Sequence, residues 1–443
     1  MRLIQEAGFS GVCIEGDWPD TYALHSYVTV ADPAQTLDGA FEPLKSRFPV
    51  WMYAHAFMLG PFAHADHRLA CLRWRNEPVR AFVAALRERN AALPADARAG
   101  IFGLDVYSLH ASMAAVKAYL ARVDPPAAEA VGACYACFDA FGDDPQLYGR
   151  VAALGRHKDG CRAAAVAALR RVAAKTDEYG ALDGMPARDA AFSNEMNARC
   201  VVDAEHYYRS MFDWNESSWN VRDKHFDDTL WRCRAHLRDT RGSDKVAVWA
   251  HNSHLGDARA TKSGAATPGG NAELNLGQAR ASPSPSRLPS RRSDMRALLP
   301  TQLARESGGA AVINIGQFTH RGTVTAADDW GEAHGTKAVR PALPGSYEEL
   351  LHAASLQAGR PTFALDLRDA KVRDALAPPV SPRLERAIGV IYRPQTERQS
   401  HYFPAHLARQ FDVAVWHDVT SALQPLDAAE PQTPEPEAFP TGL

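Results

Sequence analysis

The stretch KVAVWAHNSHLGD, residues 245–257, constrains the fold of this chain more than any other. Its apolar run, 246–250, ends abruptly in His-Asn-Ser-His, which is the pattern of a buried strand that leads into a polar loop. Ligands of open α/β sheets bind outside the carboxyl ends of the strands, so His251 and His254 predict a chemical site there. The alternative is that both imidazoles only form structural hydrogen bonds. Two histidines beside Asn252 favour the site.

Two other short apolar runs also end in acidic side chains. The segment 11–20, GVCIEGDWPD, predicts a buried strand with Glu15 near its end, followed by a helix from Thr21 that Asp20 caps. The segment 100–106 predicts a second strand that ends in Asp105. A carboxylate at one strand end and two histidines at another predict a shared site in one sheet, although a solvated loop acid remains the alternative for Glu15.

Composition excludes several classes of function. The 443 residues include 49 Lys plus Arg and 52 Asp plus Glu, so the charge gives no case for binding nucleic acid or an anionic membrane. No apolar run approaches the roughly 20 residues that span a bilayer, and the first residues lack the order of a signal peptide. Seven scattered cysteines favour a reducing compartment, so we expect a cytoplasmic protein. The C-x-x-C of Cys134 and Cys137 lies in an Ala-rich helical stretch and predicts helix packing.

The remaining pattern predicts an α/β fold, with a mixed central sheet flanked by helices and a large inserted helical subdomain. Residues 110–240 are mainly helical in pattern, and the subdomain is expected at roughly 74–240. Further strands are predicted at 310–320, 363–367, 387–392 and 411–416. The Ser/Pro/Arg-rich tract 279–300 predicts a disordered surface insert, and 427–443 a flexible tail after a domain that spans 1–426. G-x-G-x-x-G, Walker A and G-x-S-x-G motifs do not occur, which argues against a nucleophile-elbow serine hydrolase.

Polar side chains also gather in one helical segment, in a stretch just before the next helix, and in one loop. Asn197 and Tyr207 share a segment in which Asn, Arg and Tyr recur at helical spacing, and Arg222 lies in SSWNVRDKH. Arg393 follows the predicted strand 387–392. The helical face with Asn197 and Tyr207 can line a pocket for a polyhydroxylated ligand, but its pattern alone favours a polar helix surface.

Longer motifs, spread through nearly the whole chain, resemble a known family. They are EGDWPD at 15–20, FPVWM at 48–52, WRNEPV at 74–79, GLDVYS at 103–108, NARCVVDAEHYYRSMF at 197–212, SSWNVRDKH at 217–225, WAHNSHLGD at 249–257, ELNLGQ at 273–278 and YRPQTERQSHYF at 392–403. Together they resemble the erythromycin esterase family, whose members hydrolyse the macrolactone ester of macrolide antibiotics or have unassigned activity.

The resemblance implies a pocket in which a histidine acts as general base on water, and the water attacks the ester carbonyl without a covalent acyl-enzyme. Other His, Glu and Arg groups then orient the water and stabilise the oxyanion. By motif, Glu15 corresponds to an active-site glutamate and His251 to an active-site histidine, with His254 beside it. The substrate-binding candidates are Asp17, Trp18, Asp105, Asn197, Tyr207, Arg222, Asn252 and Arg393.

This sequence departs from the family pattern in two ways. The pattern places a G-E-x-x-H-G-like segment, which supplies the base, one strand and helix before EGDW, whereas Met1 falls in the helix that normally follows. We therefore expect the base to have no counterpart in this chain. Residues 53–73 and 279–300 also interrupt motifs that run almost directly into their neighbours in the family, and we expect them to be insertions or misread sequence.

Three functions follow as hypotheses. The first is a hydrolase of carboxylic ester or lactone bonds that takes a small-molecule substrate and uses neither cofactor nor metal. The second is a non-catalytic homologue that keeps the pocket and binds a small molecule. The third, a weaker hypothesis, is a metal-dependent hydrolase that uses Glu15, His251 and His254. Oligomeric state does not follow from the sequence.

Overall fold

The structure, a computed structural model, describes residues 1–30, 32–45, 74–155, 160–182, 184–212, 218–257, 260–261, 312–328, 334–377 and 382–426. These residues form two compact units, one up to Trp249 and the other from Ala250 onward. The predicted insertions at 53–73 and 279–300 and the tail at 427–443 lie outside the described residues. The proposed domain limits of 1–426 and 74–240 stay predictions.

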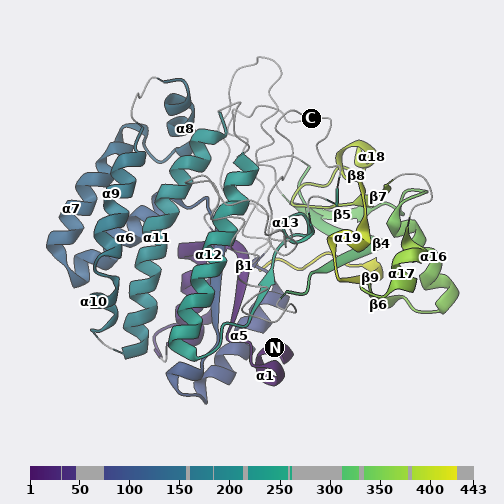
Figure 1. Cartoon of the computed structure of the whole chain (residues 1–443), viewed down its shortest axis with the longest axis horizontal. Coiled ribbons are helices and arrows are strands. Elements are labelled where there is room, and N and C mark those ends of the chain that lie inside the picture. Colours follow the sequence, from purple (N-terminus) through teal and green to yellow (C-terminus); the bar gives the residue numbers. More distant parts are fainter. Residues whose placement is uncertain are drawn as a thin grey trace, which may run out of the picture. The chain divides into compact units, whose positions relative to one another are not determined.

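The first unit is built on a parallel sheet of three strands (Figure 1). The strands are β1 (Gly11–Asp17), β2 (Gly100–Asp105) and β3 (Val246–Trp249), in the order β2-β1-β3. Gly11 is in register with Gly100 on one side and with Val246 on the other. Because β1 is the inner strand, its run of small and branched apolar residues is almost entirely buried. Parallel pairing also brings the carboxyl ends of the strands to one edge.

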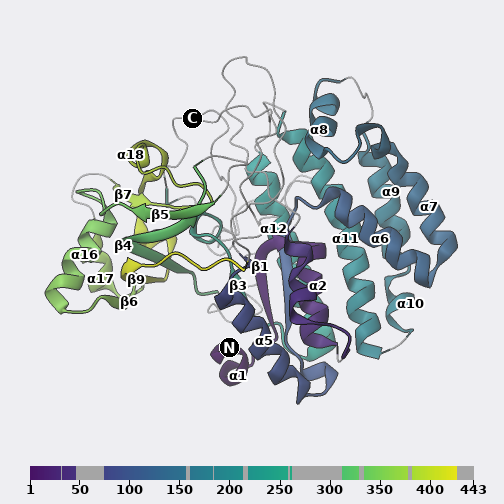
Figure 2. The ribbon, with the colours of Figure 1, turned by 180° about the vertical axis from the view of Figure 1, so that it is seen from behind.

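Short helices connect and cover these strands. They are α1 (Arg2–Ala7), α2 (Trp18–Thr29), α3 (Leu37–Phe41), η1 (Pro43–Lys45), α5 (Glu77–Ala91) and η2 (Ala95–Ala97). Gly8 ends α1 in the left-handed conformation, as its position predicts. The predicted start of α2 is wrong: the helix begins at Trp18 instead of Thr21, because Pro19 has the fixed φ that suits a first turn. Asp20 is consequently inside that turn. Figure 2 shows α2 alongside the strands, and it packs on both β2 and α5.

A helical region follows β2, as the sequence predicts. Its members are α6 (Leu109–Val123), α7 (Pro125–Tyr135), η3 (Ala136–Phe141), α8 (Pro145–Ala153), α9 (Arg162–Ala173), α10 (Thr176–Gly180), α11 (Gly184–Ser210) and α12 (Ser218–Arg241). The long helix α11 packs against α6, α8, α9, α10 and α12, so it is the centre of this region (Figure 1). Gly149 of α8 permits the closest approach, since a Cβ there would lie 2.1 Å from the carbonyl oxygen of Tyr208.

One cysteine of the C-x-x-C has a different role from the predicted helix packing. Cys137 forms a disulfide with Cys161, with their Cα atoms 5.7 Å apart. Cys134 remains a free, half-buried thiol that packs on the helical core, as expected. The spacing of the cysteines does not reveal this pair because Cys161 follows a separate helix, α8, and is brought back only by tertiary packing.

The second unit contains a four-stranded mixed sheet and a two-stranded ribbon. Its strands are β4 (Ile315–Ala326), β5 (Gly335–Val339), β6 (Thr362–Asp366), β7 (Arg383–Arg386), β8 (Tyr402–Ala405) and β9 (Val413–Thr420). The sheet order is β5-β4-β9-β6, in which only β4 and β9 are parallel, and β7 pairs with β8. Its helices are α13 (Asn252–Leu255), α16 (Tyr347–Ala358), α17 (Ala370–Leu376), α18 (Glu397–Ser400) and α19 (Leu407–Gln410). Trp416 and Tyr347 are fully buried between the sheet and α16.

The predicted mixed α/β class is confirmed, and three element predictions need correction. The strand predicted as buried at 246–250 is β3, which among the described residues is an outer strand of its sheet, and its Trp249 is 47% exposed. The strand predicted at 387–392 is wrong, because the chain there is irregular apart from one bridge at Ile391. β4 begins at Ile315, later than the predicted 310–320. None of the helices in the described ranges is both long enough and apolar enough to cross a membrane.

Candidate functional site

The carboxyl ends of β1 and β2 carry three acidic side chains to one edge of the sheet. Glu15 and Asp17 end β1, and Asp105 ends β2 directly beside Asp17 in register. Glu15 is 4% exposed and Asp105 is 1% exposed. Carboxylates this deeply buried need a positive or hydrogen-bonding partner, because transfer of an unpaired charge out of water is strongly unfavourable. The sequence prediction that Glu15 and Asp105 lie at strand ends is confirmed.

Arg222 of α12 is that partner and joins the two acids. Its Nε donates to Asp105 Oδ1 at 2.8 Å and its Nη2 donates to Asp105 Oδ2 at 2.7 Å, which makes a bidentate pair. Nη2 also reaches Glu15 Oε1 at 3.1 Å. The guanidinium is 1% exposed and lies over the rings of Tyr107 and Phe226, each 4.9 Å from the ring centroid. A planar guanidinium fixes both carboxylates in a way that a lysine ammonium cannot.

Tyrosines surround this cluster on the helical side. Tyr107, two residues beyond Asp105, packs edge-on against Tyr207 of α11 with ring centroids 5.2 Å apart. Tyr208 donates its phenol hydrogen to the carbonyl oxygen of Tyr107 at 2.9 Å. Burial raises the pKa of Tyr207 to about 12 and the pKa of Tyr107 well above its ordinary value. The Tyr107 hydroxyl also donates a hydrogen bond to the Tyr207 hydroxyl, so the two phenols are tied into one network beside the cluster.

Three other predicted substrate-binding residues make contacts that hold the fold. Asp17 Oδ1 accepts the backbone N–H of Tyr107 at 3.1 Å. Trp18 Nε1 donates to Ser193 Oγ at 3.0 Å. Asn197 Nδ2 donates to the carbonyl oxygen of Ser193 at 3.0 Å. The first bond joins the end of β1 to the segment after β2, the second joins the start of α2 to α11, and the third lies within α11. A direct role for these side chains in binding stays a prediction.

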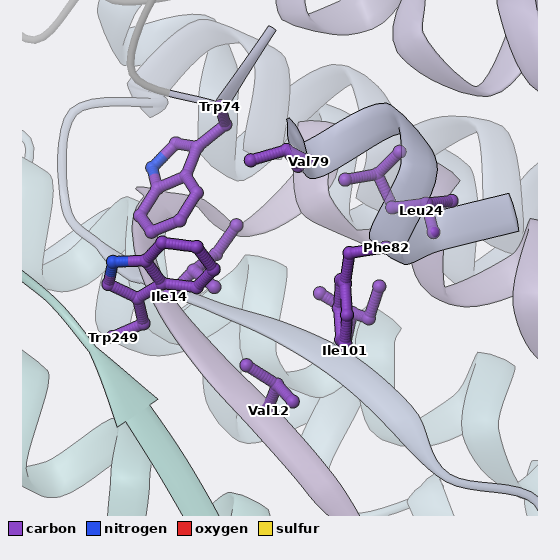
Figure 3. A pocket seen from close by; sticks show the side chains of 9 residues that line it. Val12, Ile14, Leu24, Trp74, Val79, Phe82, Ile101 and Trp249 are labelled. Carbon is purple, nitrogen blue, oxygen red and sulfur yellow. The ribbon is translucent and has the colours of Figure 1, made fainter. Parts of the chain in front are cut away.

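An apolar pocket lies next to the backbone of Glu15 (Figure 3). Its lining residues are Val12, Ile14, Leu24, Trp74, Val79, Phe82, Val83, Ile101 and Trp249. Trp74 and Trp249 pack edge-on with ring centroids 5.2 Å apart, and Trp74 Nε1 donates to the carbonyl oxygen of Glu15 at 2.6 Å. The cavity volume of about 10 Å³ is close to one water-sized sphere, so the pocket as it stands does not hold a substrate.

The predicted histidines belong to the second unit, in and just before α13. His251 Nε2 donates to the carbonyl oxygen of Ile388 at 3.0 Å, and its Nδ1 accepts the backbone N–H of Ser253 at 3.2 Å. This pattern selects the neutral tautomer with its hydrogen on Nε2. His254 is fully buried, and Asn252 exchanges two hydrogen bonds with the backbone of Gln317 in β4. The catalytic roles of His251 and His254 stay predictions.

Arg393, the last predicted residue, stabilises a loop of the second unit. Its Nε donates to the carbonyl oxygen of Asp328 at 2.6 Å, and its backbone N–H donates to His401 Nε2 at 3.2 Å. Burial lowers the pKa of His401, which keeps that imidazole neutral and able to accept this bond. Within the described ranges, no group of three or more His, Cys, Asp or Glu side chains is placed to hold a metal ion.

Sequence reasoning missed two residues that shape the cluster, Tyr107 and Trp74. Both occur in motifs quoted above, GLDVYS and WRNEPV. The signal for Tyr107 was its place two residues past a strand-end acid. No signal indicated that the indole of Trp74 binds the backbone of Glu15, since that contact spans 59 residues of sequence.

The arrangement provides a fixed, desolvated carboxylate pair with one shared cation, bordered by phenols that hydrogen-bond to one another and to the backbone. A carboxylate in this setting can accept hydrogen bonds from a water molecule. The same edge of a parallel sheet is where ligands of α/β proteins bind.

Comparison with known proteins agrees with the motifs. The family model described as erythromycin esterase matches residues 4–420. Three solved structures are similar in fold: a succinoglycan biosynthesis protein (TM-score 0.62, 16% identity, covering 96% of this chain and 83% of that one), a Bacillus cereus protein (0.63, 14%, 96% and 84%), and a histidine-to-asparagine mutant of the erythromycin esterase EreC in its open conformation (0.52, 14%, 95% and 84%). The family match covers most of the chain, and this protein therefore belongs to the erythromycin esterase family.

Proposed function

We propose that the protein hydrolyses a carboxylic ester or lactone bond of a small molecule, such as a macrolide, by attack of water. The observation that carries the proposal is the buried Arg222 cluster at the carboxyl edge of the three-stranded sheet. Arg222 holds the Glu15 carboxylate at 3.1 Å while its bidentate pair with Asp105 keeps the guanidinium from rotating.

In this mechanism, Glu15 accepts a hydrogen from the attacking water as the water oxygen adds to the ester carbonyl carbon. When the tetrahedral intermediate collapses, the bond between its carbon and the alkoxide oxygen breaks. The leaving alkoxide then takes the proton that Glu15 accepted from the water. Tyr107 and Tyr207, whose hydroxyls hydrogen-bond to each other, line the helical side of this cluster. Arg222 is a positioning residue that sets the direction of the Glu15 oxygens.

The test compares turnover of the wild type, Glu15→Gln and the surface control Glu129→Gln. Substrates are erythromycin and a chromogenic model ester, with product identified by a mass gain of one water. We expect Glu15→Gln to lower kcat by roughly 10²- to 10⁴-fold with a much smaller change in KM, because an amide cannot take the proton. Glu129 is exposed, so its variant keeps wild-type activity. Equal loss in both variants, or full activity in Glu15→Gln, contradicts the mechanism.

One observation favours a second candidate, a binding protein without turnover. Both ring nitrogens of His251 are already engaged within the second unit, with Ile388 and Ser253, so neither is available as a base in this arrangement. A binding homologue predicts that ligand raises Tm of the folded wild type while no ester is cleaved. Turnover by the wild type that Glu15→Gln abolishes excludes it.

A further inference from the structure

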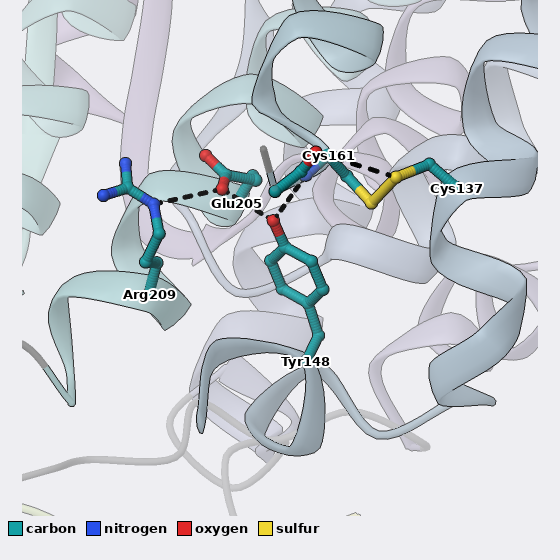
Figure 4. The surroundings of a disulfide bond; sticks show 6 residues. Cys137, Tyr148, Cys161, Glu205 and Arg209 are labelled. Carbon is teal, nitrogen blue, oxygen red and sulfur yellow. Dashed lines mark hydrogen bonds and ion pairs between the residues drawn. A yellow bond between two sulfur atoms is a disulfide. The ribbon is translucent and has the colours of Figure 1, made fainter. Parts of the chain in front are cut away.

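Three cysteines lie within one part of the helical region, and only two of them are bonded. The disulfide joins Cys137 of η3 to Cys161, the residue before α9 (Figure 4). Cys134, in the last turn of α7, is a free thiol three residues before Cys137. All three contribute to the same apolar core.

The backbone places Cys134 within bonding reach of Cys137. The two residues between them are helical, with Tyr135 at φ −77° and ψ −16° and Ala136 at φ −55° and ψ −19°. Side chains three apart on a helix have Cβ atoms about 5–6 Å apart, and a disulfide holds them at about 3.5–4.5 Å, so a local movement of about 1–2 Å brings such a pair into disulfide geometry. Cys137 can therefore bond to either of two partners, one at a time.

Accessibility selects the sulfur that is attacked. Cys134 and Cys137 are half-buried, whereas Cys161 is fully buried. Thiol–disulfide exchange requires the thiolate to approach one sulfur of the bond, and access decides which one. We therefore expect Cys134 to attack the sulfur of Cys137, with the Cys161 thiolate as the leaving group.

Hydrogen bonds hold the backbone at Cys161 in addition to the disulfide (Figure 4). Its backbone N–H donates to Tyr148 Oη at 2.8 Å, and Tyr148 donates to Glu205 Oε1 at 2.7 Å. Glu205 is fully buried and pairs with Arg209 at 3.2 Å and Arg162 at 3.5 Å. Because this network holds the backbone at the start of α9, release of the Cys161 sulfur does not require the helix to leave the core.

We propose that Cys134, Cys137 and Cys161 form a thiol–disulfide exchange site, in which the Cys134 thiolate attacks Cys137 and displaces Cys161. The Cys134–Cys137 bond forms as the Cys137–Cys161 bond breaks, and the proton lost by Cys134 is taken up by the Cys161 thiolate. One disulfide is exchanged for another, so no oxidant or reductant is consumed. The C-x-x-C motif is thus a second site, separate from the ester chemistry and independent of it.

The first test follows the exchange in the oxidised protein without added thiol. Wild type, Cys134→Ser and the neighbouring exposed control Ala133→Ser are incubated at mildly alkaline pH, and acid-quenched samples are denatured and labelled with N-ethylmaleimide. Peptide mapping then locates the label. We expect label on Cys161 to grow with time in the wild type and in Ala133→Ser, with a linked Cys134–Cys137 pair in the same samples. Cys134→Ser stays at background. Equal labelling of Cys161 in wild type and Cys134→Ser overturns the proposal.

The second test removes the leaving group instead of the nucleophile. Cys161→Ser is treated with oxidised glutathione, with circular dichroism to verify its fold. We expect the linked Cys134–Cys137 pair, because Cys134 displaces glutathione from Cys137. In Cys134→Ser/Cys161→Ser, glutathione stays on Cys137. If glutathione stays bound to Cys137 in the folded Cys161→Ser variant, Cys134 cannot reach the Cys137 sulfur and the proposal is wrong. If the single variant does not fold, the first test alone decides the proposal.

Discussion

At the scale of single residues, Arg222 determines how the acidic edge of the first unit is held. Substitution Arg222→Lys keeps the charge but loses the bidentate pair with Asp105 and the contact to Glu15. We expect the free energy of unfolding to fall by about 2–4 kcal/mol, since the loss leaves buried charge without its full set of partners. Urea denaturation measures this change. Arg170→Lys, at an exposed position in α9, is the control and leaves stability unchanged.

Asp189 of α11 makes a second buried ion cluster and gives a second prediction. It binds His236 Nε2 at 2.7 Å, Arg241 Nη2 at 2.6 Å and His25 Nε2 at 3.1 Å. Burial alone would raise the pKa of Asp189, but the hydrogen bonds from His236 and His25 hold it well below the usual range. Its contribution to stability is therefore present above the unfolded pKa near 3.8 and is lost as pH falls further.

Substitution Asp189→Asn removes this contribution. We expect about 3–5 kcal/mol of destabilisation at pH 7, because three positive or donor groups lose a common carboxylate. The difference in the free energy of unfolding between Asp189→Asn and the wild type becomes smaller as the pH falls below about 4. Urea midpoints at pH 7 and pH 3 measure it, with Asp143→Asn in an exposed loop as control. A gap of equal size at both pH values argues that the carboxylate charge is not the cause.

The residues of the site were partly predictable from the sequence. Strand-end patterns placed Glu15 and Asp105 at the edge of the sheet, and a motif singled out Arg222. The pairing of Arg222 with Asp105 was not predictable because it spans 117 residues, and no local pattern encodes which buried acid a distant arginine meets. Tyr107 was missed for the same reason, since its contact with Tyr207 depends on how α11 packs.

At the scale of elements, periodicity identified strands but not their environment. The apolar run of β3 predicts a buried strand, yet β3 is an outer strand of its sheet among the described residues. An apolar run alone does not distinguish an outer strand from an inner one. Residues 387–392 are apolar and predict a strand. The ribbon instead uses the polar β7, from Arg383 to Arg386, because strand preference depends on the partner, here β8.

The contact between β1 and β2 predicts the effect of a single methyl group. A Cβ on Gly103 would lie 2.5 Å from the carbonyl oxygen of Gly16 and 2.7 Å from that of Asp17. Gly103→Ala therefore forces the two strand ends apart beside Glu15, and we expect a loss of about 1–3 kcal/mol in the free energy of unfolding. Gly132→Ala is the matched control in α7, with nothing within 4 Å, and we expect it to gain about 0.5–1 kcal/mol. Thermal unfolding of both variants measures these changes, which we expect to be opposite in sign. A Gly103→Ala variant that is more stable than the wild type disproves the clash.

At the scale of the whole molecule, two buried glutamates make the stability of the second unit depend on pH. Burial raises the pKa of Glu348 from its ordinary 4.5 to about 7, and burial with the nearby Glu348 raises the pKa of Glu385 to about 8. Glu348 Oε1 accepts the backbone N–H of Arg386 at 2.9 Å, and Glu385 accepts from Gln410. Both acids bind protons more tightly in the folded protein than in the unfolded chain. Their contribution to the free energy of unfolding is therefore fully present below about pH 4.5 and is lost as the pH rises through about 7–8.

Substitution Glu348→Gln removes the part of this pH dependence of stability that comes from Glu348. We expect the variant to match wild type at pH 4.5 and to exceed it at pH 8 by on the order of 2 kcal/mol, since the amide stays neutral. Urea midpoints across this range measure the difference. Asp374→Asn, an exposed position in α17, is the control and keeps the wild-type slope. If the urea midpoints of Glu348→Gln change with pH in parallel with those of the wild type, Glu348 is not a source of the pH dependence.

The fold class was predictable from the whole chain, because alternating strands and helices with a helical middle section specify a mixed α/β protein. The division of its described strands into three sheets was not. Sheet membership depends on pairing between distant segments, such as β4 with β9, whose short apolar runs do not identify their partner.

The inner position of β1 also determines when the first unit can form during synthesis. Ser10, just before β1, donates its hydroxyl to the carbonyl oxygen of Ser243 at a sequence separation of 233. A ribosome adding about 5–20 residues per second needs roughly 10–50 s to make that stretch. During this interval β1 lacks at least one of its two neighbours, so its apolar side chains stay exposed on that side until β3 is made. Pausing of translation before residue 243 therefore lengthens the period in which the sheet of the first unit is incomplete.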